Sequence, residues 1–465
     1  MCEKSVIFRG LACPPRTPPL QIMALWWPVW AIMSQFLFVP VHLCDIPSGN
    51  SRLIESVNLK LLRATLDDVS KEANPSVYLG LRLSRDHNLR LETRYLKKLK
   101  NNVETITSSS QKGTSEKPST GILALHLMAL TSACDNLGAQ QRKKIIAQLT
   151  LELKEEKKNI VTNNRPKSNY FQYSLGILAL CVAKKKVDVH IINKLLNAEK
   201  DKKFVHAETT TVDTEAVAGM AFMCLKRSDL YTTELRGQLS TAVESVKQKI
   251  LDSQNTDGSL GNIYSTGLAV QFLSALETKD AQTCSKATEA LLEAIKQGKF
   301  SNPMMMSQIM PVLHGKSYLD VANVDCTLES DNLFISPVSV LPELPNGGVS
   351  INVQLVVEGP SGQSITHDIH VPSQSSLLDI LETAQKQNSN FRYEKMDSLY
   401  GPYLTSVNGV KSSTAASTYW QLLKDPNISL VEGIADYKPG DGERIILRLS
   451  KCPALHAGLR LIHKR

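Results

Sequence analysis

The sequence lacks several patterns that would mark a metalloprotein or a common hydrolase. None of its nine cysteines belongs to a CxxC pair, the spacing found in most structural zinc sites. It contains no Gly-x-Ser-x-Gly elbow, which would present the nucleophile of an α/β-hydrolase. No paired carboxylates stand out of the kind that glycosidases use as acid and base. These absences weigh against a zinc site and against common hydrolase chemistry.

Aromatic residues are also scarce, at 6%, and the net charge of +8 is thinly spread. Basic clusters such as 142–144 and 184–186 lie beside polar turns without interleaved aromatics, which nucleic-acid-binding surfaces usually carry. We therefore expect solvated helix ends and no nucleic-acid partner, although a basic face could meet an acidic protein.

One long apolar run occurs, at residues 24–43, and it is interrupted by Pro28 and Pro40. No basic stop-transfer cluster follows it, so the run favours a secretory signal over a membrane span. A signal would begin at Met23, which makes residues 1–22 an upstream extension. We expect the fold to exclude residues 1–43 and the mature chain to be secreted and extracellular.

Secretion changes the interpretation of the cysteines. Seven follow the predicted signal, and six of them lie in or beside one region, enough for three disulfides. The seventh, Cys452, lies alone in a basic tail at 451–465 and has no assigned role. Asn427-Ile428-Ser429 is the one glycosylation sequon.

Six short apolar stretches recur roughly every 40 to 55 residues, the period of a two-helix repeat unit. Each follows a longer stretch with only one apolar face, which is typical of an outer helix, whereas the apolar stretches must be buried on all sides. This alternation predicts a mainly α fold, an (α/α)6 barrel over residues 44–326. The apolar stretches begin at Ser76, Ser119, Ser174, Asp213, Ser265 and Pro303.

The starts of the predicted inner helices are polar, and two explanations remain open. Their side-chain oxygens can cap the helices, or they can also converge on one rim around a ligand. The Gly-rich turn 257–262 resembles turns of terpene-cyclase and prenyltransferase toroids, yet the Asp-rich motif of those enzymes is missing.

Beyond residue 326 the helical period disappears. Residues 327–347 collect Pro and Gly and predict a linker. Short strand patterns then predict a small β-rich α+β domain at 348–450, with one helix at 375–387. The segments 401–403 and 417–421 are interpreted as loops. Trp420 is either core, the commoner fate of a tryptophan, or a flat cover for a ligand.

These stretches together resemble the vertebrate cobalamin carriers, and the likeness runs from Cys44 to Leu449. That family has an (α/α)6 barrel followed by a small β-rich domain, with cobalamin and its cobalt held between the two. The resemblance is carried by NPSVYLGLRLS (74–84), NYFQYSLGILALC (169–181), VDT (212–214), GNIYST (261–266), SQIMPVLHGKSYLDV (307–321), GPYLTSV (401–407), WQLLKDPN (420–427) and GIADYKPGDGE (433–443).

The resemblance implies a set of ligand contacts. Amide and carboxylate side chains suit cobalamin because its amide fringe needs both donors and acceptors, while its ring faces need apolar cover. Each residue also has a structural reading, Asp213 and Ser265 as caps and Gln308 as a buried, bonded amide. The implied contacts are Ser168, Asn169, Tyr170, Phe171, Gln172, Thr209, Thr210, Asp213, Asn262, Ser265 and Gln308 in the barrel, and Trp420, Gln421 and Leu422 in the second domain.

The family's disulfides map onto Cys44–Cys284, Cys134–Cys326 and Cys181–Cys224. Two positions depart from the family pattern. Where a histidine can coordinate cobalt, this chain has Thr209–Thr211, so either nearby His206 is the axial ligand or a threonine hydroxyl bonds a cobalt-bound water. Ile122 stands where the family can carry a glutamine.

The resemblance therefore implies a monomeric carrier, not an enzyme, that binds cobalamin and enters cells through a cell-surface receptor, with no membrane span of its own. Two other classes stay open on the residues alone. One is a toroid enzyme acting on lipid or glycan, which should have convergent acids in the barrel mouth. The other is a pure interaction protein with an empty barrel.

Overall fold

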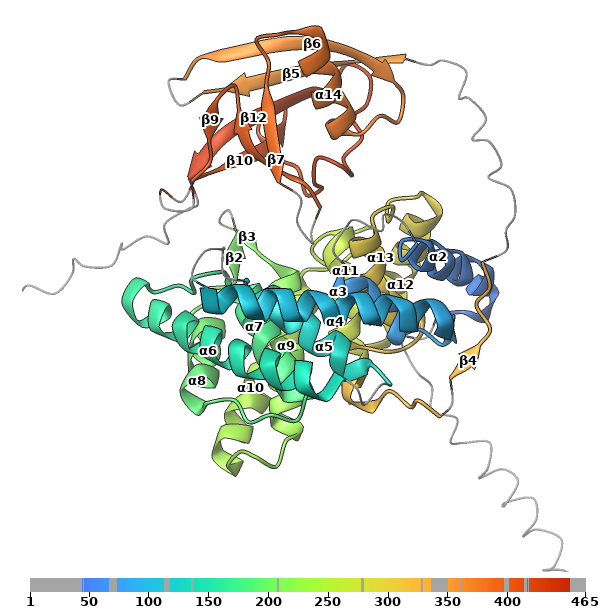
Figure 1. The fold of residues 1–465 in the computed structure, drawn as a ribbon, viewed down its shortest axis with the longest axis vertical. Coiled ribbons are helices and arrows are strands. Elements are labelled where there is room, and N and C mark those ends of the chain that lie inside the picture. Colours follow the sequence, from blue (N-terminus) through green and yellow to red (C-terminus); the bar gives the residue numbers. More distant parts are fainter. Residues whose placement is uncertain are drawn as a thin grey trace, which may run out of the picture. The chain divides into compact units, whose positions relative to one another are not determined.

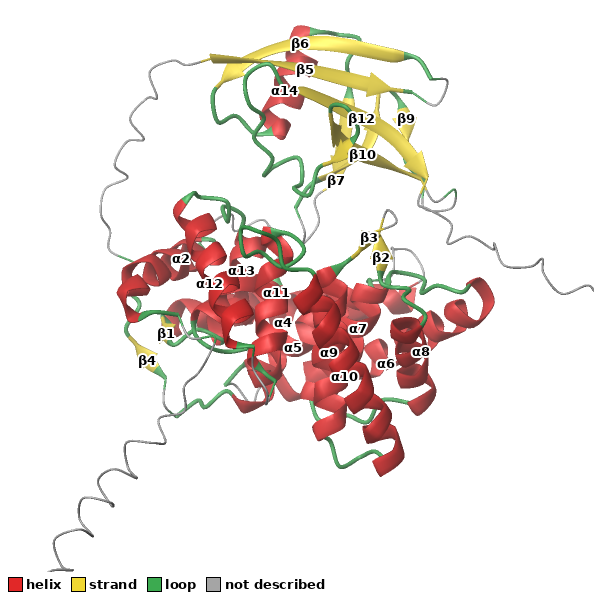
Figure 2. Ribbon diagram, turned by 180° about the vertical axis from the view of Figure 1, so that it is seen from behind, coloured by secondary structure: helices red, strands yellow, loops and turns green. Residues whose placement is uncertain are grey.

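The computed structural model describes residues 44, 46–66, 73–112, 118–134, 138–206, 209–276, 280–327, 329–335, 350–359, 362–396, 401–413, 416 and 418–451. The predicted signal and upstream extension, and the tail beyond Lys451, lie outside these residues. Helices make up the first part of the described chain and strands most of the last (Figure 2).

Six amphipathic helices alternate along the chain with six apolar ones in the described part of the first 313 residues. The amphipathic helices bury one face only; in α10, for example, Leu239, Val243, Val246 and Ile250 are buried at helical spacing. These outer helices are α2 (Ser51–Arg63), α4 (Leu89–Lys112), α6 (Ala139–Asn163), α8 (Val189–Lys200), α10 (Thr233–Asp252) and α12 (Ala281–Lys296).

The apolar helices form a closed inner ring, in which each contacts the next and the last contacts the first. Almost every residue of these helices is buried, as their all-round apolar sequences require. The predicted (α/α)6 barrel is confirmed (Figure 1). The inner helices are α3 (Pro75–Arg82), α5 (Thr120–Ser132), α7 (Tyr170–Val182), α9 (Val212–Arg227), α11 (Ile263–Ser274) and α13 (Pro303–Leu313).

The return through an outer helix makes all six inner helices run in the same direction, so their N-terminal ends meet at one end of the ring. We call this end the rim. At the other end, the 3-10 helix η3 (Tyr318–Asn323) follows α13 and contacts α5, α7 and α9. The Gln271 side chain of α11 holds it, because its Oε1 accepts the Tyr318 N–H at 2.9 Å.

Three disulfides join distant parts of the barrel, in the pairings that the family resemblance implied. Cys44–Cys284 and Cys134–Cys326 close loops of 240 and 192 residues, and Cys181–Cys224 links α7 to α9. Such cross-links stabilise a fold chiefly by restricting the unfolded chain, by roughly 2–4 kcal/mol each.

The segment after η3 is tied to the barrel. Strand β4 (Ser330–Asp331) pairs in parallel with β1 (Asp86–His87), and the Leu333 side chain is buried. Behind this pairing Arg82 binds Glu329 and Glu92, all three almost fully buried. The first part of the predicted linker is therefore packed structure, while 336–349 lies outside the described residues.

The second domain is built on a five-stranded sheet with the order β11-β10-β12-β5-β6. Helix α14 (Leu377–Gln387) and a small sheet of β7, β8 and β9 contribute to one hydrophobic core with it. The strands are β5 (Ser350–Glu358), β6 (Ser364–Pro372), β7 (Tyr393–Met396), β8 (Tyr403–Val407), β9 (Val410–Lys411), β10 (Thr418–Lys424), β11 (Ile428–Ser429) and β12 (Arg444–Lys451).

Two segments of this domain differ from the sequence prediction. The segments 401–403 and 417–421 are predicted as loops, but Tyr403 begins β8 and residues 418–421 belong to β10. The error in β10 is large because this strand pairs with β12 along its whole length. Its sequence, TYWQLLK, places two leucines side by side and so hides the alternation that marks a strand.

Candidate functional site

The rim is lined by the capping residues of the inner helices. Side-chain oxygens of Asn74, Ser119, Asn169, Asn262 and Asn302 each accept a backbone N–H from the first turn of the following helix. An asparagine that caps through Oδ1 still has its Nδ2 hydrogens to donate. Capping by a side-chain oxygen thus holds at these five helix starts, of which Ser119 is also a start predicted from the sequence. The Nδ2 groups of Asn169 and Asn262 make no hydrogen bond to the described residues.

Gln172 connects two neighbouring inner helices at the rim. Its Oε1 accepts the Gly121 N–H at 3.1 Å, so the α7 side chain satisfies a free backbone donor at the start of α5. A Cβ on Gly121 would lie 3.0 Å from Gln172 Cγ, which shows how closely the amide approaches this backbone. The Gln172 Nε2 group makes no hydrogen bond to the described residues and can serve a ligand.

Glu156, on outer helix α6, fixes the same part of the rim and was not predicted from the sequence. Its carboxylate accepts the Ser168 hydroxyl at 2.6 Å, the Ser168 N–H at 3.1 Å and the Thr120 hydroxyl at 2.8 Å. Ser168, an expected ligand contact, therefore donates its hydroxyl hydrogen to Glu156 of α6, the carboxylate that also accepts the Thr120 hydroxyl of α5. Glu156 thus holds Ser168, which directly precedes Asn169, the capping residue of α7.

Tyr170 has a buried polar atom without a partner among the described residues. Its side chain is 7% exposed and packs against Tyr173 and Phe204, while its hydroxyl makes no hydrogen bond there. Burial raises the pKa of this phenol to about 12, with a smaller contribution from the Asp201 carboxylate. A neutral hydroxyl left unpaired in an apolar place is costly, and a ligand acceptor would relieve that cost.

The GNIYST segment builds the start of α11. Asn262 and Ser265 form a capping box, and Ser265 Oγ also donates to the Leu260 carbonyl at 2.7 Å. The Ser265 hydroxyl is thus occupied by the helix start and holds Asn262, whose side chain is exposed. Gly261 has φ +72°, and a Cβ there would meet Val212 at 2.5 Å, so this turn requires glycine.

Two further expected contacts are Asp213, in the first turn of α9, and Gln308, in the second turn of α13. Asp213 accepts the Thr214 N–H at 2.9 Å, while the cap position of α9 is Thr211, which makes no side-chain capping bond. Asp213 is therefore not the cap that its position suggested. Gln308 is partly exposed in α13, and its carbonyl accepts Gln271 Nε2 at 2.8 Å.

A buried charge cluster lies behind the start of α9. Lys249 Nζ lies 2.7 Å from Glu199 Oε1 and 3.2 Å from Glu215 Oε1, so one cation serves two buried carboxylates. The second oxygen of Glu215 has no partner in the described part of the chain. Burial raises the pKa of Glu215 to about 7, although Lys249 opposes the rise.

This cluster predicts how stability varies with pH. A carboxyl whose folded-state pKa exceeds its ordinary value of 4.5 favours folding while it is protonated, and that contribution is lost as pH rises toward 7. Between pH 5 and pH 8, Glu215 should lower the free energy of unfolding of the parent protein by roughly 3 kcal/mol or less. We expect Glu215→Gln to abolish this decrease. Urea denaturation of the parent and of the Glu215→Gln variant at both pH values measures the two free energies of unfolding. The same pH dependence in the parent and the variant would contradict the prediction.

In the threonine run, Thr209 and Thr210 are described only in their backbone, like His206, whereas the Thr211 hydroxyl lies 3.5 Å from the Phe204 carbonyl oxygen. Strand β2 (Val205–His206) pairs with β3 (Thr209–Thr210) in an antiparallel register that sets His206 opposite Thr209. The side chains of these three residues lie outside the described ones, so the axial-ligand alternatives stay predictions.

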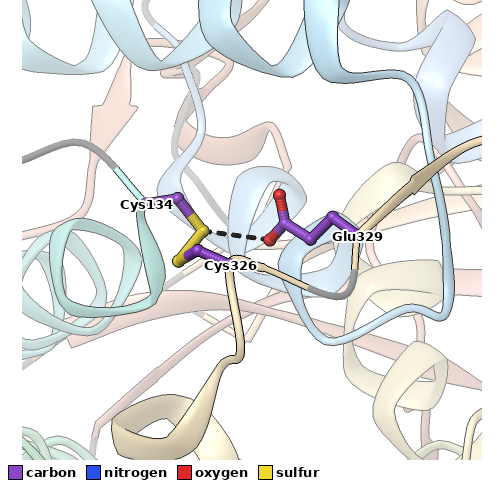
Figure 3. A group of neighbouring side chains, drawn as sticks. All are labelled: Cys134, Cys326 and Glu329. Atoms are coloured by element: carbon purple, nitrogen blue, oxygen red, sulfur yellow. Dashed lines mark hydrogen bonds between the residues drawn. A yellow bond between two sulfur atoms is a disulfide. The ribbon is translucent and has the colours of Figure 1, made fainter.

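One group in the described chain has the spacing of a metal site, and its chemistry does not suit a cation (Figure 3). Cys134 and Cys326 are joined in a disulfide, so neither can be a thiolate ligand. Glu329 Oε1 lies 3.0 Å from Cys134 Sγ, a close contact rather than a donated bond because a disulfide sulfur has no hydrogen. Arg82 binds the same carboxylate and would repel a cation.

The expected contacts in the second domain do not share one face. Trp420 is 6% exposed in the domain core, and its Nε1 donates to the Val410 carbonyl at 3.2 Å. Leu422 packs against that core, whereas Gln421 points to the opposite face of β10, because side chains alternate along a strand. Gln421 Oε1 accepts the Ser450 hydroxyl at 2.7 Å.

Comparison with known proteins places this architecture in a family. The model of eukaryotic cobalamin-binding proteins matches residues 27–346, and a domain of unknown function matches residues 374–451. Transcobalamin-2 of Bos taurus is 40% identical over 88% of this chain and 95% of its own, and human cobalamin binding intrinsic factor is 32% identical over 86% and 92%.

A solved structure has the same two-domain fold. The crystal structure of haptocorrin in complex with Cbi superposes with a TM-score of 0.72 at 26% identity, covering 88% of this chain and all of haptocorrin. In the described part of the chain, no helix has both the length and the apolar character needed to cross a bilayer. With the family model matching most of its length, the chain belongs to the eukaryotic cobalamin-binding proteins.

Proposed function

We propose that this protein is a secreted carrier that binds cobalamin at the barrel rim and under the second domain, and carries it to cells. Family membership supports the ligand, because the similar proteins are named transcobalamin-2 and cobalamin binding intrinsic factor and the similar structure holds Cbi. The observation that carries the proposal is that the amide nitrogens of Gln172 and Asn262 make no hydrogen bond to the described residues, while the buried Tyr170 hydroxyl is also unpaired among them.

The rim residues divide into two roles in this proposal. Gln172 and Asn262 donate through their amide nitrogens, Asp213 accepts from ligand amides, and Gln308 does both. Ser168, Asn169 and Ser265 hold these groups in place through the Glu156 network and the capping box. Phe171, Trp420 and Leu422 give apolar cover, and Gln421, Thr209 and Thr210 complete the set that the resemblance implies.

A toroid enzyme is a weaker alternative because the carboxylates near the rim are already engaged. Glu156 accepts three hydrogen bonds from Ser168 and Thr120, and Glu215 pairs with Lys249 behind α9. Asp213 is then the acid that the proposal assigns to the ligand, and a single carboxylate does not make a glycosidase acid–base pair. The relatives are carriers, which supports the same conclusion.

Delivery and cobalt ligation are finer parts of the proposal. A carrier of this family would act extracellularly as a monomer and enter cells through the transcobalamin receptor, whose acidic module would suit the net charge of +8. At the cobalt, either His206 supplies nitrogen or a threonine of 209–211 bonds a cobalt-bound water.

Co-elution tests the carrier proposal directly. The purified chain is mixed with aquocobalamin and gel-filtered, and the visible spectrum of the protein peak is recorded. Pink colour in that peak is expected, and a colourless peak would overturn the proposal. A spectral shift that disappears in His206→Ala would show nitrogen ligation, whereas an unshifted spectrum would favour the water-bound form.

A rim variant tests the position of the ligand. Gln172→Leu removes one amide donor and its bond to Gly121, so we expect about tenfold weaker cobalamin binding, or roughly 1.4 kcal/mol. The matched control is Gln140→Leu on the exposed surface of α6, which should bind like the parent. Equal dissociation constants for both variants, measured by spectral titration, would place the ligand elsewhere.

A further inference from the structure

The one glycosylation sequon of the sequence lies on an exposed turn of the second domain. Asn427 ends the turn between β10 and β11, and Asn427, Ile428 and Ser429 are all exposed. Asn-x-Ser is accepted when x is not proline, and Ile428 meets this condition. Asn74-Pro75-Ser76 has the same outer residues, but its middle residue is proline, which excludes it as a sequon, and Ser76 is buried.

The Asn427 side chain is held in an orientation that suits modification. Its Oδ1 accepts Arg448 Nη2 at 2.8 Å, and Arg448 is itself bound to Glu358. The Nδ2 group makes no hydrogen bond within the described part of the chain. Attachment of a sugar at Nδ2 therefore leaves the Arg448 bond intact, because that bond uses only the oxygen.

Exposed apolar side chains lie next to Asn427, where a glycan would cover them. The two-residue strand β11 lies at the edge of the sheet, and Ile428 within it and Val431 just after it are 52% and 66% exposed. Exposed apolar edge strands are templates for association with another chain, and proteins usually cover them. A glycan is bulky and solubilising, and it would start one residue before this strand.

We propose that Asn427 is N-glycosylated and that its glycan covers the β11 edge against self-association. In the reaction, Asn427 Nδ2 forms a bond to the anomeric carbon of an oligosaccharide carried on a lipid diphosphate. The bond from that carbon to the diphosphate oxygen breaks, the lipid diphosphate leaves, and Nδ2 loses one proton. The proposal rests on the proposed secretion, because this reaction occurs in the secretory pathway.

Expression of the full chain in secretory animal cells tests the modification. N-glycosidase treatment should increase the electrophoretic mobility of the protein and convert Asn427 to aspartate, which peptide mass spectrometry detects. Asn427→Gln and Ser429→Ala should both abolish the shift, while Ser429→Thr, which retains the sequon, should keep it. A secreted parent protein with unmodified Asn427 would overturn the proposal.

Two further experiments distinguish a failure of the native secretion signal from a failure of the glycosylation and covering proposals. A second version, in which a standard secretion signal replaces residues 1–43, keeps the glycan test independent of the native leader. Sedimentation velocity then compares the native protein before and after deglycosylation, and we expect more self-association without the glycan. Ile428→Lys in the Asn427→Gln background should restore the monomer. Unchanged sedimentation after deglycosylation would refute the covering role.

Discussion

Replacing Lys249 by methionine should destabilise the barrel by about 3–5 kcal/mol at pH 8, since it leaves buried carboxylates without their cation. Glu199 and Glu215 have side chains only 6% and 2% exposed, and both bind Lys249. Glu199 would keep a hydrogen bond from Ser245, whereas Glu215 would lose the only ion pair it makes among the described residues. Urea denaturation followed by helical circular dichroism measures the loss.

The control for this variant is Lys296→Met. Lys296 makes an exposed pair with Glu293 on α12, so its removal should cost less than about 1 kcal/mol. Adding Glu215→Gln to Lys249→Met should recover part of the loss, and lowering the pH to 5 should do the same because Glu215 then takes up a proton. A Lys249→Met protein as stable as the control would show that the cluster is solvated.

Replacing Arg82 by methionine should have a comparable effect, about 3–5 kcal/mol, at the opposite end of the barrel. The guanidinium binds Glu92 at 3.0 Å, Glu329, and the Ser132 carbonyl at 3.1 Å, and its side chain is 3% exposed. Without it, the carboxylates of Glu92 and Glu329 would lose the cation that they share, and only Glu92 would keep a nearby imidazole, that of His87, whose Nδ1 lies 3.1 Å away.

The Arg82 variant should also release the segment that follows η3. Glu329 would lose its cation, so amide hydrogen exchange at 330–333 should accelerate along with the fall in stability. Arg94→Met, which changes an exposed arginine on α4, is the matched control and should do neither. Unchanged protection at 330–333 would mean that the β1–β4 pairing holds this segment without Arg82.

The ring itself could be predicted from the sequence because burial on all sides leaves a local signal. Stretches such as GILALHLMAL are apolar at every position but one, His126, and only the inner ring of a barrel buries such a helix on all sides. The start of helix α7 was predicted less well. The helix begins at Tyr170, four residues before the predicted Ser174, and its aromatic and amide-rich first turn hid this start from the apolar pattern. Its capping residue, Asn169, was assigned to the ligand alone.

The support of the rim could not be predicted in the same way. Glu156 lies 36 residues from Thr120, and its position on α6 resembles that of any solvated glutamate. Glu215 looks like a favourable acid in a first helical turn, and its burial depends on outer helices α8 and α10, which supply Glu199 and Lys249. Such contacts depend on the tertiary arrangement, which no local pattern records.

The common direction of the inner helices gives the barrel an electric polarity. Each helix carries about half a positive charge at its N-terminal end, so six ends amount to roughly three positive charges at the rim. The opposite end, where η3 contacts the ring, carries the negative ends. A ligand that bears a phosphate would thus be attracted to the rim and oriented with its phosphate toward the helix N-termini before any side chain contacts it.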